Sequence, residues 1–106
     1  MSIPEYPVTA TATLRHERAG RYAKQLISHW KAYSEPFLVE GETSTLVFPT
    51  VELGQCLVAI TVTDDEVGFA AAAINETQLD YITGEVTSHI FGWAKDRDTL
   101  EIVWSR

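Results

Sequence analysis

The sequence has a single cysteine, few basic residues and no long apolar run, and each scarcity excludes a class of protein. Cys56 cannot form an internal disulfide, so the chain does not require an oxidising compartment. No stretch approaches the roughly 20 apolar residues of a membrane-spanning helix, and the first residues do not resemble a signal peptide. By elimination, the sequence predicts a cytoplasmic protein that does not associate with membranes.

The balance of charge narrows the range of partners. Lysine and arginine total 8 against 15 aspartates and glutamates, which gives a formal net charge of −7. Because phosphate contacts need an excess of basic residues, this balance argues against nucleic-acid binding. The basic residues are concentrated within residues 15–31, which hold five of them and one acidic residue. Four of these form a candidate binding face on the first predicted helix: Arg18, Arg21, Lys24 and Lys31.

The length of 106 residues and a composition of 45% apolar and 22% charged residues predict a single domain. Residues 1–7 are expected to form an extended N-terminal tail, and residues 8–106 a single α+β domain. Threonine alternates with apolar residues over 8–14, which predicts a strand. Apolar residues at helical spacing between Ala19 and Tyr33 then predict an amphipathic helix that ends at residues 34–36.

Four more strands and a second helix are expected next. The strands fall at 37–40, 45–48, 55–63 and 67–72, with residues 41–44 as the first connecting loop. Asn75 is expected to cap a helix whose buried stripe runs from Leu79 to Trp93, and alternation over 100–104 predicts a last strand. The order β-α-β-β-β-β-α-β predicts a two-layer sandwich: a mainly antiparallel sheet with both helices on one face. The expected core residues are Trp30, Val58, Ile60, Ile82, Val86 and Trp104.

Scattered positions of the chain resemble one bacterial family. They are Arg21-Tyr22, Gln25-Leu26 with His29-Trp30, the run from Gly54 to Leu57, His89-Ile90, and Leu100 with Trp104. Over residues 9–105 they resemble the family known as domain of unknown function 2218, which has no established activity. Related domains occur fused to siderophore-interacting, FAD-binding reductases, so the resemblance implies a link to iron handling and a reductase partner.

Two histidines are candidate metal ligands. His29 and His89 each flank the buried stripe of a predicted helix, so side-by-side helices would let the two imidazoles face one another. The pair could then ligate a transition metal or an iron porphyrin, with Glu85 as a third ligand or an orienting partner. The alternative is that each ring bonds a neighbour and covers apolar surface. We favour that alternative, and expect the protein to fold without metal, because the histidines lack a close metal-ligand spacing.

The patterns expected of an enzyme are weak. Ser28-His29 and Ser88-His89 are adjacent in helices, so their side chains point about 100° apart and cannot form a nucleophile–base pair. Cys56 is predicted on the apolar face of a strand, where a thiol is inert. We therefore assign no catalytic residue and no cofactor, and favour a non-catalytic binding or accessory module that acts through its surface or a small pocket. The alternative is a metal- or haem-related protein that uses His29 and His89.

The sequence also predicts a partner. Two helices on one face leave the other face of the sheet open, and we expect Leu57, Ala59 and Val103 on that side. An apolar strip of this kind is commonly covered by a symmetric copy of the same chain. We therefore expect a homodimer through the open sheet face. Docking of the basic helix on the acidic surface of a second copy is the alternative.

Overall fold

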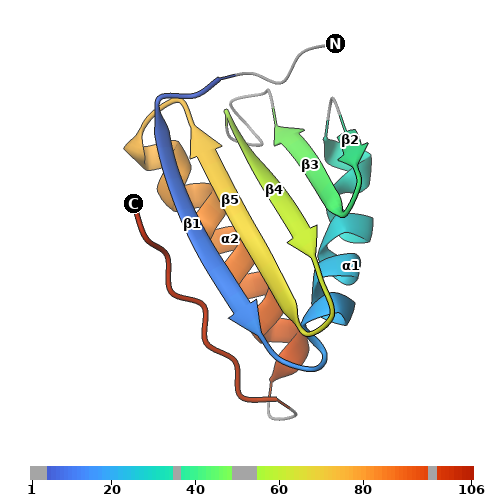
Figure 1. Cartoon of the computed structure of the whole chain (residues 1–106). Coiled ribbons are helices and arrows are strands. Elements are labelled where there is room, and N and C mark those ends of the chain that lie inside the picture. The colour runs from blue at the N-terminus through green and yellow to red at the C-terminus, as the bar shows by residue number, and fades with distance from the viewer. Residues whose placement is uncertain (1–4, 35–36, 49–54, 96–97) are drawn as a thin grey trace.

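The computed structural model describes residues 5–34, 37–48, 55–95 and 98–106, which form a five-stranded sheet and two helices packed on it (Figure 1). The predicted tail at residues 1–7 and the predicted helix end at residues 34–36 each fall partly outside these residues; Ser34, which is described, has an extended backbone. The strands and helices are β1 Val8–Arg15, α1 Ala19–Trp30 with the 3-10 turn η1 Lys31–Tyr33, β2 Phe37–Glu40, β3 Thr43–Phe48, β4 Cys56–Val62, β5 Glu66–Ala73 and α2 Glu76–Ala94.

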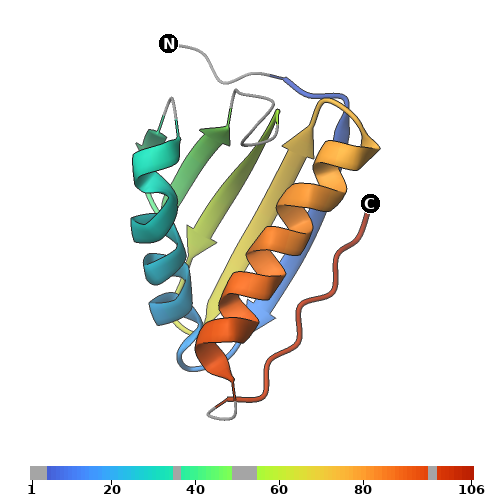
Figure 2. The same cartoon turned by 180° about the vertical axis from the view of Figure 1, so that it is seen from behind.

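The sheet is antiparallel throughout its described strands, in the order β1-β5-β4-β3-β2. Both helices lie on the same face of it, α1 over the β2–β3 side and α2 over the β1–β5 side (Figure 2). The predicted α+β class, the antiparallel sheet and the single helical layer are therefore confirmed. The observed order of elements is β-α-β-β-β-β-α.

The core lies where the period-2 and helical patterns of the sequence predict it. In β1, Ala10, Ala12 and Leu14 are buried while the intervening threonines are exposed. In α1, Leu26 and Trp30 belong to the buried stripe, and the basic side chains lie off it. The core between helices and sheet also contains the predicted Val58, Ile60, Ile82 and Val86.

Helix α2 begins where the sequence predicts. The side chain of Asn75 accepts a hydrogen bond of 2.9 Å from the backbone N–H of Gln78, which satisfies one of the unpaired donors of the first turn. Farther along, the Thr83 hydroxyl donates to the Leu79 carbonyl at 3.0 Å, so this buried polar group is satisfied within the helix.

The hairpin between β2 and β3 is tighter than predicted. The sequence suggested a loop of residues 41–44, but Glu40 pairs with Thr43, so Gly41 and Glu42 alone make the turn. Gly41 has a φ of 61°, a conformation that side-chain-bearing residues adopt only with strain. The β-branched Thr43 and the following Ser44 extend the strand because both pair with β4.

The predicted sixth strand over 100–104 is wrong. The C-terminal segment 98–106 runs beside β1 (Figure 1), but its ladder is limited to one bridge between Thr11 and Ser105. Its side chains hold it instead. The Trp104 indole N–H donates to the Thr87 hydroxyl of α2 at 3.0 Å, and Arg106 pairs with two acidic side chains of the same helix. Trp104 consequently packs against the core half-buried, not inside it as predicted.

The outer face of the sheet differs in part from the apolar strip of Leu57, Ala59 and Val103 that the sequence suggested. Leu57 faces away from the helices but is only 8% exposed, beside the buried Val47 of β3, and Ala59 is half-buried. Val103 is 65% exposed but belongs to the C-terminal segment, so it does not lie on a strand of this face. Small and hydroxyl-bearing side chains make up most of the exposed remainder, at Thr9, Thr11, Thr13 and Ala70.

Candidate functional site

The packing of α1 against α2 brings His29 and His89 together. Their ring centroids lie 5.2 Å apart with ring planes inclined by 43°. The Trp93 ring lies 6.1 Å from His29 and 5.8 Å from His89, so it completes a cluster of three rings between the helices. The two histidines that the helical pattern places on facing flanks are therefore neighbours.

The orientation of His89 is fixed by its own helix. Its Nδ1 lies 2.8 Å from the backbone carbonyl oxygen of Glu85, and 3.5 Å from the carboxylate of the same residue. A carbonyl only accepts hydrogen bonds, so Nδ1 of the neutral ring carries the proton and Nε2 carries the lone pair. His89 therefore presents an acceptor at Nε2. Glu85 orients the ring from the opposite nitrogen.

A cavity of about 250 Å³ opens beside this pair. Its lining comes from α1, η1, β3 and α2, and consists of His29, Trp30, Tyr33, Phe48, Tyr81, Ile82, Glu85 and His89. Trp30, Phe48 and Ile82 are buried, whereas Tyr33 and Tyr81 are exposed. The pocket thus has an apolar floor and a rim of two tyrosines.

The aromatic rings of the floor meet at steep angles. Trp30 and Phe48 have centroids 5.5 Å apart and ring planes at 85°, and Trp30 and His89 have centroids 5.2 Å apart with planes at 69°. Edge-to-face pairs of this kind are favourable beyond the area that they bury. The floor is therefore a corner of crossed rings held in place by their own packing.

The rim carries one negative charge. Burial raises the pKa of Tyr81, and the charge of Glu85 and a hydrogen bond to it raise the pKa further. Tyr81 therefore stays protonated and donates toward Glu85, one helical turn ahead on α2. No lysine or arginine is among the lining residues that the structure describes.

A second polar cluster ties the C-terminal segment to the start of α1. The Asp98 side chain is only 5% exposed, and it accepts hydrogen bonds from Arg18 at 2.6 Å and from the Tyr22 hydroxyl. His16 Nε2 lies 3.6 Å away, while its Nδ1 accepts from the Arg18 backbone N–H at 3.0 Å. The bond from Tyr22 and the charge of Arg18 hold the pKa of Asp98 below its usual value, against the effect of burial. These bonds fasten the segment to the helix.

Comparison with known proteins places the chain in a family. The sequence pattern of a bacterial family described as "Uncharacterized protein conserved in bacteria (DUF2218)" matches residues 11–105. The chain belongs to this family. The resemblance noted from scattered positions of the sequence is thereby confirmed, and every residue that lines the pocket falls within the matched region.

The fold of this DUF2218 domain is similar to that of a solved structure. It is the NMR structure of PA4090 from Pseudomonas aeruginosa, with a TM-score of 0.70 over 93% of this chain and 96% of that chain. The two sequences are 23% identical, so the similarity shows a common fold. No match was found among curated proteins.

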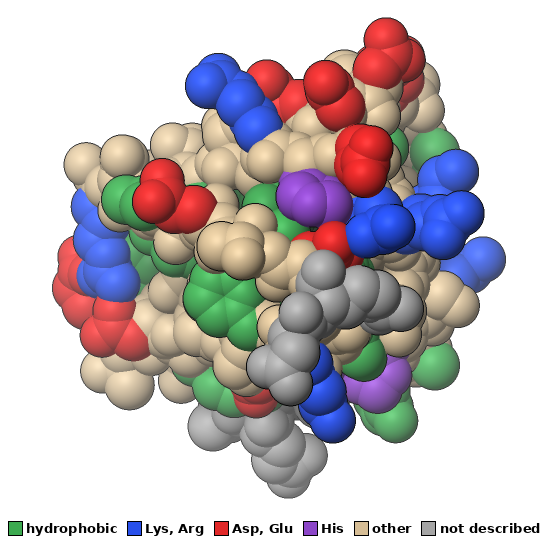
Figure 3. Space-filling model, turned by 90° about the horizontal axis from the view of Figure 1, so that it is seen from below, with side chains coloured by type: hydrophobic (Ala, Val, Ile, Leu, Met, Phe, Trp, Pro, Cys, Tyr) green, Lys and Arg blue, Asp and Glu red, His purple; other side chains and the backbone are tan. Residues whose placement is uncertain are grey.

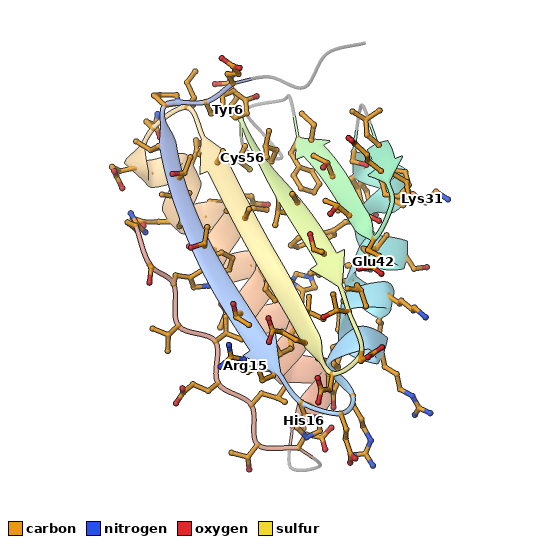
Figure 4. The ribbon with its side chains drawn as sticks, viewed as in Figure 1. Tyr6, Arg15, His16, Lys31, Glu42 and Cys56 are labelled. Carbon is orange, nitrogen blue, oxygen red and sulfur yellow. The ribbon has the colours of Figure 1, made fainter. Side chains whose placement is uncertain are left out.

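The basic residues of this DUF2218 domain do not form one free patch. Arg18 bonds Asp98, whereas Arg21, Lys24 and Lys31 are exposed. The Lys31 ammonium lies 5.2 Å from the centroid of the Phe37 ring. Lysine and arginine side chains gather on one side of the lower end of the molecule, close to acidic ones (Figure 3). Lys31 lies far from this end, near the top of the helical layer, while His16 lies at the bottom (Figure 4).

Cys56 lies away from solvent at the start of β4, as the sequence predicts for its apolar face. Burial raises the pKa of its thiol to about 12, which keeps it protonated. Within the described residues, no group of three or more histidine, cysteine, aspartate and glutamate side chains is arranged to hold a metal ion. None of the helices in the same residues combines the length and apolar character of a membrane span.

Sequence reasoning missed most of the pocket's aromatic lining. It singled out His29, His89 and Glu85, but not Tyr81. Tyr81 lies on the same flank of α2 as Glu85 and His89, because the three are spaced i, i+4, i+8. That spacing is a usable signal, because residues four apart share a helix face. Phe48 gave no such signal, since it reaches the pocket from a strand.

Proposed function

We propose that this domain is a non-catalytic binding module that holds a small ligand in the pocket between α1, η1, β3 and α2. The observation that carries the proposal is the crossed-ring floor of Trp30 and Phe48 beneath a rim of exposed tyrosines. Ligand sites are typically apolar and aromatic concavities with a few polar groups that fix orientation. Here those polar groups are the side chains of Glu85, His29 and His89.

The composition of the lining also supports binding over catalysis. The described lining residues include no serine, threonine, cysteine or lysine that His89 could activate as a nucleophile. The Cys56 thiol, whose pKa is raised by burial, belongs to the core and not to the lining. The lining residues provide contact area and hydrogen-bonding groups, which are the features that a binding site needs.

The test is a screen of small aromatic and apolar compounds by two-dimensional NMR on the labelled protein. We expect shifts confined to residues that line the pocket, with quenching or enhancement of Trp30 fluorescence. Tyr81→Ala should weaken binding, and Phe91→Ala is the matched control, because these aromatic residues of α2 are 40% and 41% exposed and only Tyr81 lines the pocket. Compounds that shift residues elsewhere, or equal losses in both variants, would contradict the proposal.

A second candidate is a transition-metal site at His29 and His89, favoured by the separation of their rings. A tetrahedral ion bonded at about 2.05 Å to each ring would hold the centroids roughly 5.2 Å apart. The observed separation is 5.2 Å. Two histidines bonded to opposite sides of a haem iron would need ring centroids about 6.4 Å apart. A single ion therefore suits the pair better than a haem does.

The role of Glu85 in such a site follows from the nitrogen that it faces. It contacts Nδ1 of His89, so an ion at Nε2 would have Glu85 as an orienting residue and not as a third ligand. Titration with Zn²⁺, Ni²⁺ and Cu²⁺ by calorimetry tests this candidate. One ion per chain, lost in both His29→Ala and His89→Ala with circular dichroism unchanged, would establish the metal. Folded protein that binds none of the three would exclude this candidate.

A further inference from the structure

We propose that the ligand of the pocket is an organic ammonium cation, bound by the faces of the aromatic rings; this rests on the proposed function that the pocket takes a small molecule. Four aromatic side chains of different elements converge on the cavity, namely Trp30, Tyr33, Phe48 and Tyr81. The face of an aromatic ring attracts a cation within about 6 Å, most strongly in tryptophan. Surrounding rings are the recurrent means of recognising alkylated ammonium groups.

The geometry of the floor suits a rounded cation better than a flat neutral ring. Trp30 and Phe48 stand at 85° to one another, so their surfaces form a corner and not the parallel walls that stack on a planar ligand. An ammonium group with several alkyl substituents has no preferred plane. It can contact both rings of such a corner at once.

The charges around the cavity favour a positive ligand. Glu85 stands at the rim, where Tyr81 donates toward its carboxylate and Nδ1 of His89 lies 3.5 Å from it. Lys31, which follows the lining residue Trp30 in the chain, has its ammonium 5.2 Å from the centroid of the Phe37 ring and does not line the cavity. A net charge of −7 adds a long-range attraction for cations. An anionic ligand would be repelled both by the Glu85 carboxylate and by the overall negative charge.

The volume points to a small group. The cavity of about 250 Å³ is below the roughly 300–1,000 Å³ typical of pockets that enclose a drug-sized ligand. It has room for one alkylated ammonium head. The open rim between Tyr33 and Tyr81 would allow the remainder of a longer molecule to extend into solvent.

The test compares choline with 3,3-dimethylbutan-1-ol, which has the same shape but carries carbon in place of the charged nitrogen. Both are titrated into the full chain at low ionic strength, by calorimetry and two-dimensional NMR. We expect one choline per chain, shifts at the lining residues, and affinity at least about tenfold above that of the neutral alcohol, because each cation–π contact adds to the attraction.

Variants separate the two sources of attraction. Glu85→Gln should weaken choline binding about three- to tenfold and leave the neutral alcohol unaffected, with Glu101→Gln, an exposed acid of the C-terminal segment, as the matched control. Tyr33→Leu should weaken it through loss of a ring face. Tyr33→Phe keeps the face and should restore binding, which a general loss of structure would not allow.

The outcomes distinguish this inference from the proposed function. If the neutral alcohol binds as tightly as choline, or if only uncharged aromatic compounds bind, the cation is wrong and the binding pocket stands. If neither choline, the alcohol nor any screened compound shifts the lining residues of the folded protein, the proposed function itself is wrong. Choline-induced NMR shifts centred on residues away from Trp30 would overturn the proposal that the aromatic rings of this pocket bind the cation.

Discussion

The packing of α1 onto the sheet makes a quantitative prediction at Leu26. This side chain is fully buried in the core between α1 and the strands. Truncation to alanine removes three carbon atoms, worth about 2.4 kcal/mol at roughly 0.8 kcal/mol each, and leaves a cavity that adds to the cost. The helix is fastened at its start by the Asp98 cluster and at its end by Trp30 against Phe48, so it has little freedom to collapse into the space.

We therefore expect Leu26→Ala to lower the free energy of unfolding by about 3 to 4 kcal/mol, in the middle of the range of about 2–5 kcal/mol for such changes. With a urea dependence of about 1.5 kcal/mol per molar, the midpoint of unfolding should fall by roughly 2 to 2.7 M. The matched control is Ile27→Ala, the half-buried neighbour on the same helix, which should cost less than about 2 kcal/mol. A loss below about 1 kcal/mol at Leu26, or an equal loss at Ile27, would refute this account of the core.

Three further predictions concern the C-terminal segment and the sheet face. The pKa of Asp98 is lower in the folded state, so the stability that it contributes is complete above its unfolded pKa near 3.9 and is lost as pH falls through the lower folded pKa. Asp98→Asn should therefore be less stable than the parent protein at pH 7. Urea unfolding at pH 3 should show a smaller difference in stability between the two proteins. Trp104→Phe should cost about 0.5 to 1.5 kcal/mol through the lost bond to Thr87, and a double-mutant cycle with Thr87→Val should show coupling instead of additive losses. We also propose a homodimer through the outer sheet face, centred where Ala59 pairs with Ala70. Light scattering at micromolar concentration should give twice the monomer mass for the parent protein and the monomer mass for Ala70→Glu. A monomer mass for the parent protein at both low and high salt would contradict the dimer.

Periodicity in the sequence was sufficient for the elements that bury one face. The threonine–apolar alternation of β1 and the spacing of Leu26 and Trp30 in α1 each identify a buried side correctly, because one-sided burial imposes the pattern directly. The same reasoning placed His29 and His89 on facing flanks, and their rings are neighbours. Local pattern therefore reaches as far as the relation between two helices on one sheet.

The C-terminal segment shows where this reasoning stops. Leu100, Ile102 and Trp104 alternate with exposed residues because one side of the segment packs on the core, and not because its backbone pairs along β1. Alternation records which side is buried, whereas a strand also requires a ladder of backbone hydrogen bonds, which a sequence pattern does not report. Phe48 was not predicted as a pocket residue for a related reason, since only the tertiary arrangement brings its strand to the helices.

The position of β1 in the sheet has a consequence for the order of folding. β1 is the first strand in the chain, yet its described neighbour in the sheet is β5, with Val8 opposite Ala73. The hairpins β3–β4 and β4–β5 join close neighbours in the chain, whereas β1 must wait for β5 and so closes a much longer loop. Substitutions at Ala10 or Ala12 should then raise the unfolding rate far more than they slow refolding, whereas Ile60→Val should slow refolding. During synthesis, β1 would remain without β5, its described partner, until Ala73 had emerged.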